Sequence, residues 1–306
     1  MTRFFDTLLT SLSIGSLYAL IALGYTLVYG VLRFINFAHS DVVTLGAWLA
    51  VAFAGALGWA GTESPVFALP VILVLTMAAC ALIGVAIEAL AYRPLRRAPR
   101  LNVLITAIGV SLFLQNFGQL RWVFGPIPAS SPELVLDRTL FVVGGVSVRL
   151  VDVAIIGLAV LLMLALEVLV YRTKLGRAMR AVSFDERIAA LMGVNVNRVV
   201  SITFAIGAGL AAAGGLIFTM KYPKVGQTAD SAWVLLGLKA FVAAVVGGIG
   251  NVRGALVGAM LIAAVEQFGA TYLSSTLQDV YVFLILIGVL LWRPSGLFGR
   301  VYVEKV

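Results

Sequence analysis

The stretch TLLTSLSIGSLYALIALGYTLVYGV, residues 7–31, contains no charged side chain and decides the fold class. An α-helix rises ~1.5 Å per residue, so about 20 apolar residues are enough to cross ~30 Å of hydrocarbon. The run is too long for the apolar core of a cleavable signal peptide, which has about 7–15 residues. We therefore expect a retained membrane-spanning helix.

Runs of the same kind recur along the whole chain. Of the 306 residues, 61% are hydrophobic and only 12% are charged, whereas a soluble domain has about 25% charged residues. The candidate spans are residues 7–31, 37–57, 67–91, 103–121, 151–171, 199–220, 232–248, 254–273 and 279–292. The seventh and eighth are joined by GGIGNVRG, which fits either a tight turn or a break within a re-entrant element. We predict an all-α polytopic transmembrane helix bundle with eight or nine spans, in which residues 1–306 form a single transmembrane domain.

The basic residues indicate how the spans are oriented. YRPLRRAPR (92–100) has four Arg and no acid, and the segment 171–198 has six Lys or Arg against two acids. Short cytoplasmic loops retain Lys and Arg, so both segments belong in the cytoplasm. With nine full spans the N-terminus lies outside, whereas one re-entrant element among the first two spans places both termini inside. Orientation explains the basic excess, so nucleic-acid binding is not needed.

The predicted external segment, at about 123–150, contains RTLFVVGGVSVRLV. Two β-branched runs flank Gly144 and Gly145, a pattern typical of a hairpin with a two-glycine turn. Such a hairpin is equally consistent with a binding surface for a soluble partner and with a simple loop between spans.

A membrane protein that pumps a solute needs a source of energy, and an ATP-binding motif would be visible in its sequence. The dipeptide Gly-Lys does not occur, so the chain has no phosphate-binding loop of that kind and does not hydrolyse ATP by itself. One His and one Cys are too few for a zinc site. Transport then depends either on an ion gradient, for which carriers place acids near the midplane, or on an ATPase from another subunit. Glu266 is the acid deepest within a span, and Lys239 is the base placed to pair with it.

The second basic segment, about 172–198, has the pattern of a short amphipathic helix. Its apolar residues recur at nearly helical spacing between arginines: Leu175, Met179, Val182, Ala189 and Met192. Such a helix lies at a membrane surface, where it binds either anionic lipid headgroups or a cytoplasmic subunit.

Four stretches together carry a resemblance that covers nearly the whole chain. They are GSLYALIALGYTLVYGVLRFINFAHSDVVTLGAWLA, GRAMRAVSFDERIAALMGVNVNRVVSITFAIGAGLAAAGG, VVGGIGNVRGALVGAMLIAAVEQF and WRPSGLFG. In this order they resemble the LivH-type permeases of branched-chain amino acid ABC importers. One departure is Ser40, which stands after the histidine where the family usually has glycine.

The resemblance implies a multi-pass protein of the bacterial inner membrane that works with other subunits. These are a second permease of LivM type, two cytoplasmic ATPase subunits that bind the ATP, and a periplasmic substrate-binding protein. The chain itself is then no enzyme and needs no cofactor. The residues that dock into the ATPase would be Gly176, Arg177, Arg180, Asp185, Ala189 and Gly193. The alternatives are an ion-gradient-driven secondary transporter and a passive small-solute channel.

The polar stretch RFINFAHSD, residues 33–41, is the other candidate functional feature. In one interpretation Asn36 or Ser40 caps the second span at the membrane surface and Asp41 lies favourably in its first turn. In the other, this helix begins below the surface and its start faces the translocation cavity. The candidate pathway residues are Asn36, His39, Ser40, Asp41, Tyr18, Tyr25 and Glu266.

The last pattern consists of glycines spaced for close helix packing. Gly250, Gly254 and Gly258 recur at intervals of four, which places them on one helix face. We expect packing within the chain rather than a subunit contact.

Overall fold

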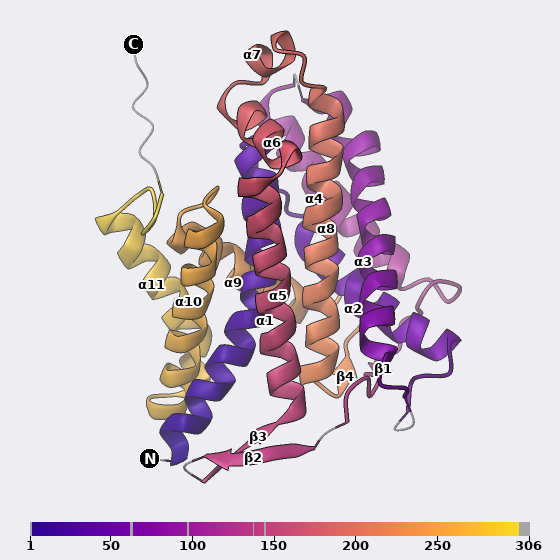
Figure 1. Cartoon of the computed structure of the whole chain (residues 1–306), viewed down its shortest axis with the longest axis vertical. Coiled ribbons are helices and arrows are strands. Elements are labelled where there is room, and N and C mark those ends of the chain that lie inside the picture. The colour runs from indigo at the N-terminus through magenta and orange to yellow at the C-terminus, as the bar shows by residue number, and fades with distance from the viewer. Residues whose placement is uncertain (1, 62–63, 97, 137, 144, 300–306) are drawn as a thin grey trace.

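The computed structural model describes residues 2–61, 64–96, 98–136, 138–143 and 145–299. In this part of the chain, eight helices are long and apolar enough to cross a membrane, and α9 is a shorter apolar helix. These nine helices, which run broadly along the long axis in Figure 1, coincide with the nine predicted spans. They are α1 (Thr2–Leu32), α2 (His39–Ala56), α3 (Ala68–Ile87), α4 (Arg100–Gly118), α5 (Leu150–Arg172), α8 (Val196–Lys221), α9 (Ser231–Gly247), α10 (Val252–Tyr272) and α11 (Gln278–Trp292).

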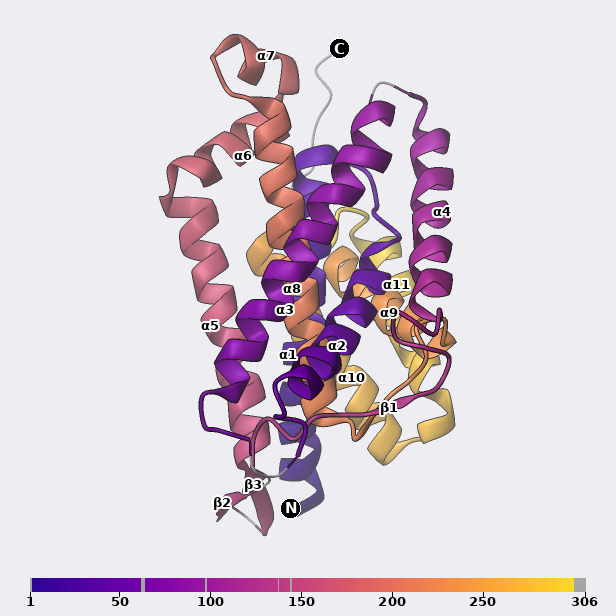
Figure 2. The same ribbon diagram turned by 90° about the vertical axis from the view of Figure 1, so that its right-hand side faces the viewer.

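Two helices, α1 and α8, form the centre of the bundle. Helix α1 packs against α5, α8, α9 and α10, while α8 packs against α1, α2 and α3 (Figure 2). Glycine and alanine dominate α8 over residues 207–215, where all side chains are buried. A Cβ atom added at Gly46 of α2 would lie 2.9 Å from the Ala212 carbonyl oxygen, closer than Cβ contacts normally are. The absence of side chains at these positions therefore lets α2 approach α8 closely.

The two ends of the bundle differ as the charge pattern predicts. The helices α6 (Lys174–Phe184) and α7 (Glu186–Leu191) lie at one end, together with the basic segment that follows α3. Arg96 of that segment donates to Asn197 at the start of α8. The antiparallel strands β2 (Thr139–Val143) and β3 (Val146–Arg149) lie at the opposite end, so the predicted hairpin is confirmed (Figure 1). The short strands β1 (Ala129–Ser130) and β4 (Lys224–Val225) also pair there.

The cytoplasmic segment is two helices and not the single amphipathic helix predicted for residues 175–192. The Asp185 side chain accepts hydrogen bonds from the backbone N–H groups of Arg187 and Ile188, and this cap starts a new helix. Met179 and Ala189 are buried as expected. Met192 is 80% exposed, because the turn at Asp185 directs α7 away from the bundle.

The glycine series forms a packing surface with one exception. Gly254 and Gly258 of α10 face the backbone of α9 at Gly247 and Ala243. Gly250 does not share their helix face, because α10 begins only at Val252. It lies in the tight turn between α9 and α10 with φ +93°.

Candidate functional site

Helix α2 begins inside the bundle and not at the end that carries α6 and α7. Its first residue, His39, lies against Ile21 and Gly24 of α1. Helix α1 continues to Leu32, eight residues beyond Gly24, which corresponds to about 12 Å of further helix. The chain therefore turns back after α1, and residues 33–38 descend into the bundle before α2 starts (Figure 2). This is the geometry of the second interpretation of RFINFAHSD.

The capping interpretation of this stretch is wrong for Asn36 and Ser40, although Asp41 does lie in the first turn of α2. The N-cap of α2 is Ala38, which has no side chain able to cap. The Asn36 side chain instead accepts a hydrogen bond from the Tyr92 hydroxyl at 2.6 Å, and the Ser40 hydroxyl donates to the Phe37 carbonyl oxygen. The Asn36 side chain is thus engaged by a tertiary contact, whereas the Ser40 hydroxyl makes a local bond to the preceding turn.

His39 is held against α1 by directed contacts. Its Nε2 donates to the carbonyl oxygen of Ile21 at 3.3 Å, since a carbonyl only accepts. Its ring lies 4.4 Å from that of Tyr25, and the Tyr25 ring also contacts Phe241 of α9. The start of α2 is thus fixed to the central helix by both a hydrogen bond and an aromatic contact.

Asp41, in the first turn of α2, is bound from α4. The Gln115 side chain donates to Asp41 Oδ1 at 2.8 Å. The backbone carbonyl of Gln115 in turn accepts from the Thr228 hydroxyl at 2.7 Å. Thr228 lies in the connection between α8 and α9. The Trp48 indole of α2 donates to the carbonyl of Gly226 in the same connection. We call these residues the α2-start cluster: Tyr25, Asn36, His39, Ser40, Asp41, Tyr92, Gln115 and Thr228.

Two of the predicted pathway residues belong to a different cluster. The Tyr18 hydroxyl donates to Glu266 Oε2 at 2.7 Å, and Lys239 Nζ lies 2.7 Å from Glu266 Oε1. Lys239 also forms an ion pair of 2.6 Å with Asp279 of α11. This Lys239 cluster (Tyr18, Lys239, Glu266 and Asp279) joins α1, α9, α10 and α11. The pair of Lys239 with Glu266 forms as the span positions suggest, but Tyr18 does not share a site with Tyr25.

The cytoplasmic helices are bonded to the connection between α1 and α2. Arg33 Nη2 donates to the Ser183 carbonyl oxygen at 2.9 Å, and the Ser183 hydroxyl donates to the carbonyl of Gly30. Arg33 has φ +55°, a conformation that costs a non-glycine residue about 1 kcal/mol. The end of α6 is therefore linked to a strained residue only six positions before α2.

The predicted ATPase-docking residues mostly shape this segment. Gly176 packs against the backbone of α5, Asp185 caps α7, Ala189 is buried, and Gly193 ends α7 at φ +82°. Arg180 donates to the Val170 carbonyl and lies over the Tyr171 ring, whereas Arg177 is exposed.

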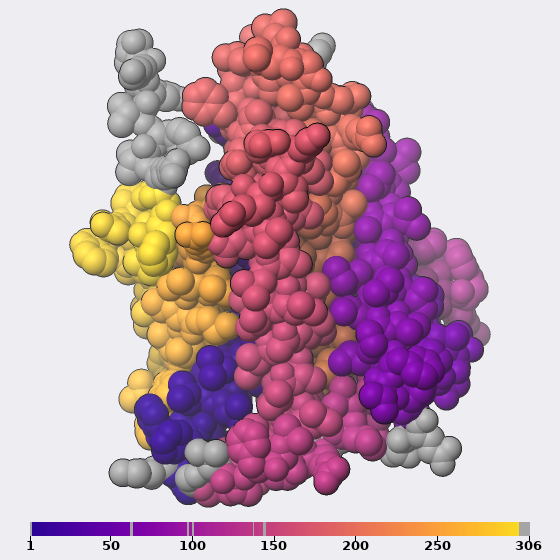
Figure 3. All heavy atoms as spheres, viewed as in Figure 1, coloured from indigo at the N-terminus to yellow at the C-terminus, as the bar shows by residue number. Residues whose placement is uncertain are grey.

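An exposed apolar surface at α6 and α7 was not predicted from the sequence. It consists of Phe184, Ile188, Leu191 and Met192, and we call it the α6–α7 tip. Leu191 is 87% exposed. Figure 3 shows α6 and α7 forming this end of the molecule. Phe184, Ile188 and Leu191 recur at helical spacing in the sequence, beside Met192 of the predicted stripe, so this surface was visible there.

Other members of the α2-start cluster gave weaker signals. Gln115 is a polar residue within the predicted span 103–121, whose cost in hydrocarbon could have marked it. Thr228 lies in a short connection with no distinguishing pattern.

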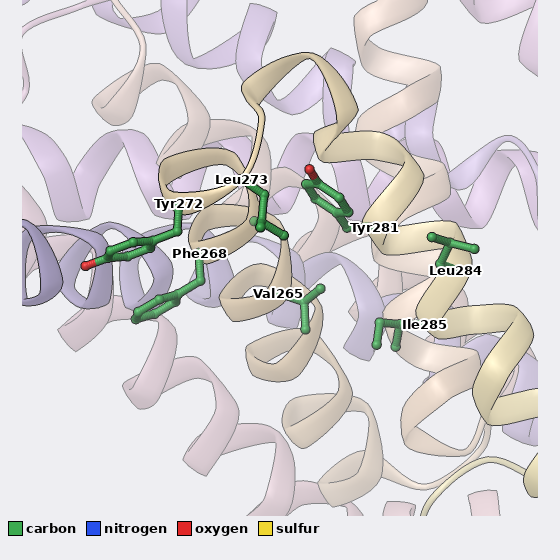
Figure 4. A pocket seen from close by; sticks show the side chains of 8 residues that line it. Val265, Phe268, Tyr272, Leu273, Tyr281, Leu284 and Ile285 are labelled. Carbon is green, nitrogen blue, oxygen red and sulfur yellow. The ribbon is translucent and has the colours of Figure 1, made fainter.

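Two cavities lie outside both clusters. One of about 530 Å³ lies between α10 and α11, lined by apolar and aromatic side chains such as Val265, Phe268 and Tyr281 (Figure 4). It offers a polar solute few partners. The other, of about 400 Å³, is a polar recess at the external end, lined by Arg3, Asp6, Thr7, Thr10, Gln267 and Thr271.

Comparison with known proteins agrees with this architecture. The profile of the family described as "Branched-chain amino acid transport system / permease component" matches residues 7–291. The chain is 39% identical to the high-affinity branched-chain amino acid transport system permease protein BraD of Pseudomonas aeruginosa, over 99% of this chain and 98% of that protein. It is 38% identical to LivH of Escherichia coli K12, over 99% of this chain and 98% of LivH. No solved structure matches the chain. The chain belongs to the family of permease components of branched-chain amino acid transport systems.

Proposed function

We propose that this chain imports branched-chain amino acids across the bacterial inner membrane as one permease of a heterodimer with a LivM-type permease. Two cytoplasmic ATPase subunits bind and hydrolyse the ATP, so this chain needs no cofactor and catalyses no reaction. A periplasmic binding protein delivers the solute. The names of the relatives support the substrate class.

The observation that carries the proposal is the bonded connection from α6 to the start of α2. Movement of α6 acts on Arg33 through its hydrogen bond to Ser183. Residues 33–38 pass this movement to His39 and Asp41 without an intervening helix. A motor at the cytoplasmic end can thus move groups deep in the bundle.

The α6–α7 tip supports docking of the motor subunit. An apolar patch beyond the membrane-spanning helices costs free energy in water, so it favours burial by another protein. Gly193 and the Asp185 cap hold the tip in shape. Leu191 and Met192 supply its most exposed apolar side chains.

The proposed translocation route passes the α2-start cluster. On the external side it is covered by the α8–α9 connection, through the bond from Thr228 to the Gln115 carbonyl. On the cytoplasmic side it is covered by residues 33–38, through the bond from Tyr92 to Asn36. Alternating access requires two such covers that open in turn.

The ion-driven alternative finds its best support in the Lys239 cluster, where two carboxylates share one ammonium group. Reconstitution of the complete system in liposomes separates the two functions. We expect leucine uptake that requires ATP, the ATPase subunits and the binding protein. Uptake by this chain alone in response to a proton or sodium gradient would establish the secondary carrier, and ungated leak would establish a channel.

Docking is tested by placing a charge on the tip. Leu191→Glu should abolish or strongly reduce co-purification with the ATPase subunits, because a buried unpaired carboxylate costs several kcal/mol. The matched control is Leu136→Glu, the same change at an exposed residue of the external segment. Undiminished co-purification of Leu191→Glu would contradict docking at this tip.

A further inference from the structure

Buried carboxylates in this chain are nearly all neutralised by basic side chains. The described residues include four buried acids, and three of them form ion pairs. The pairs are Glu88 with Arg93 and Arg96, Asp152 with Lys221, and Glu266 with Lys239. Asp41 is the fourth, and none of the ion pairs of the described residues includes it.

Asp41 is also incompletely hydrogen-bonded. The residue is 2% exposed, and its Oδ2 atom is buried without a hydrogen-bond partner among the described residues. The Gln115 amide donates to Oδ1, and Ser111, one turn earlier on α4, is the other side chain of that helix that interacts with the carboxylate. A buried carboxylate without a cation is costly, and it attracts any positive group that can reach it.

The surroundings leave Asp41 reachable when the bundle opens. Its neighbour Ser40 packs against Gly237 of α9, and His39 packs against Gly24 and the Tyr25 ring of α1, so two glycines border the start of α2. The covers described above lie on its two sides, one at Thr228 and one at Asn36. Asp41 is thus placed between an external and a cytoplasmic cover.

We propose that Asp41 Oδ2 receives the ammonium group of the transported solute, which supplies the cation that this buried carboxylate lacks. The inference rests on the proposed function and names the substrate group recognised in this chain. The carboxylate of the same amino acid then faces the first turn of α2, an end that no side chain caps. Recognition requires the α-amino group and is indifferent to the side chain of the solute.

The test uses the permease heterodimer with its ATPase subunits in lipid nanodiscs, without the binding protein. Saturation-transfer NMR detects the binding of millimolar leucine to the heterodimer. Two analogues are then added as competitors. 3-Methylbutylamine keeps the ammonium group of leucine and lacks its carboxylate. 4-Methylpentanoate keeps the carboxylate and lacks the ammonium group. We expect the amine to displace leucine and the acid to be weaker by about tenfold or more. Competition by the acid as strong as that by leucine overturns the assignment.

The variant Asp41→Asn should weaken leucine binding by about tenfold or more, because a charge-assisted hydrogen bond is lost. The control Asp6→Asn makes the same change at an exposed acid and should bind as the wild type does. Wild-type affinity in Asp41→Asn overturns the proposal. If Asp41→Asn does not assemble, the competition in the wild type decides.

The proposed function and the role of Asp41 are contradicted by different outcomes. A complete wild-type system that takes up no branched-chain amino acid contradicts the proposed function. A system that takes up leucine, with an unchanged KM in Asp41→Asn, contradicts only the role of Asp41. Leucine uptake without any leucine signal from the wild-type heterodimer also counts against that role.

Discussion

Single buried charges distinguish the two polar clusters. In the Lys239 cluster, one ammonium group holds carboxylates from α10 and α11, and Tyr18 satisfies the remaining oxygen of Glu266. In the α2-start cluster, Asp41 has a hydrogen-bond donor but no base. The first arrangement stabilises a fixed packing of helices, whereas the second is suited to a transient partner.

Replacement of the shared base tests this structural role. Lys239→Met should lower the free energy of unfolding by about 3–5 kcal/mol, because Glu266 remains buried without its cation. Asp279 contributes less, since its side chain is 41% exposed. The double variant Lys239→Met/Glu266→Gln should recover part of the loss. SDS titration of the purified chain measures both.

The control for this series is Lys224→Met, at an exposed lysine of β4. It should change the free energy of unfolding by little. A loss in Lys239→Met no larger than that of the control would show that the cluster does not stabilise the bundle.

Among the elements, α2 and α6 have the closest functional relation. Helix α2 starts beside the middle of α1, and α6 ends on the connection that leads to it. The glycine- and alanine-rich face of α8 allows α2 to lie against it without interlocking side chains. These contacts favour α2 as the element that moves when the cytoplasmic helices move.

Removal of the Arg33 side chain should uncouple the two elements. Arg33→Gly keeps the positive φ without strain and deletes the hydrogen bond to Ser183. We expect a severalfold lower ratio of leucine uptake to ATP hydrolysis, with assembly unchanged. The measurement is paired uptake and ATPase assays in liposomes.

Arg121→Gly provides the comparison, because it removes an exposed arginine from the turn that follows α4. In that variant the ratio of uptake to hydrolysis should stay near the wild-type value. An undiminished ratio in Arg33→Gly would mean that the motion reaches α2 by another route.

The whole molecule is polarised along its long axis. The basic segments and the α6–α7 tip lie at one end, and the β2–β3 hairpin and the polar recess at Arg3 lie at the other. The tip is thus suited to a cytoplasmic motor and the opposite face to a periplasmic protein. Such a polarity is the expected result of retaining Lys and Arg in the cytoplasm.

Site-directed labelling checks this polarity. In a Cys80→Ser background, Leu140→Cys should react with an impermeant maleimide added outside intact cells, and Arg187→Cys should not. Both side chains replaced are exposed in the structure, so accessibility depends on the side of the membrane alone. Inverted vesicles should give the opposite pattern. Outside labelling at position 187 would reverse the orientation.

The sequence by itself determined the nine apolar helices and the hairpin, and its Lys and Arg residues predict how the helices are oriented. These features depend on local quantities, namely the length of an apolar run, the side on which Lys and Arg lie, and turn residues such as Gly145. It also contained the amphipathic character of the cytoplasmic segment, although the cap at Asp185 divides that segment into two helices.

Only the tertiary structure decided where the polar groups meet. The depth at which α2 begins depends on contacts of His39 with α1, and the separation of Tyr18 from Tyr25 depends on which helices face each. The lack of a base at Asp41 is likewise visible only when all neighbouring helices are in place. These properties arise from pairs of residues far apart in the chain, so no local pattern of hydrophobicity or charge encodes them.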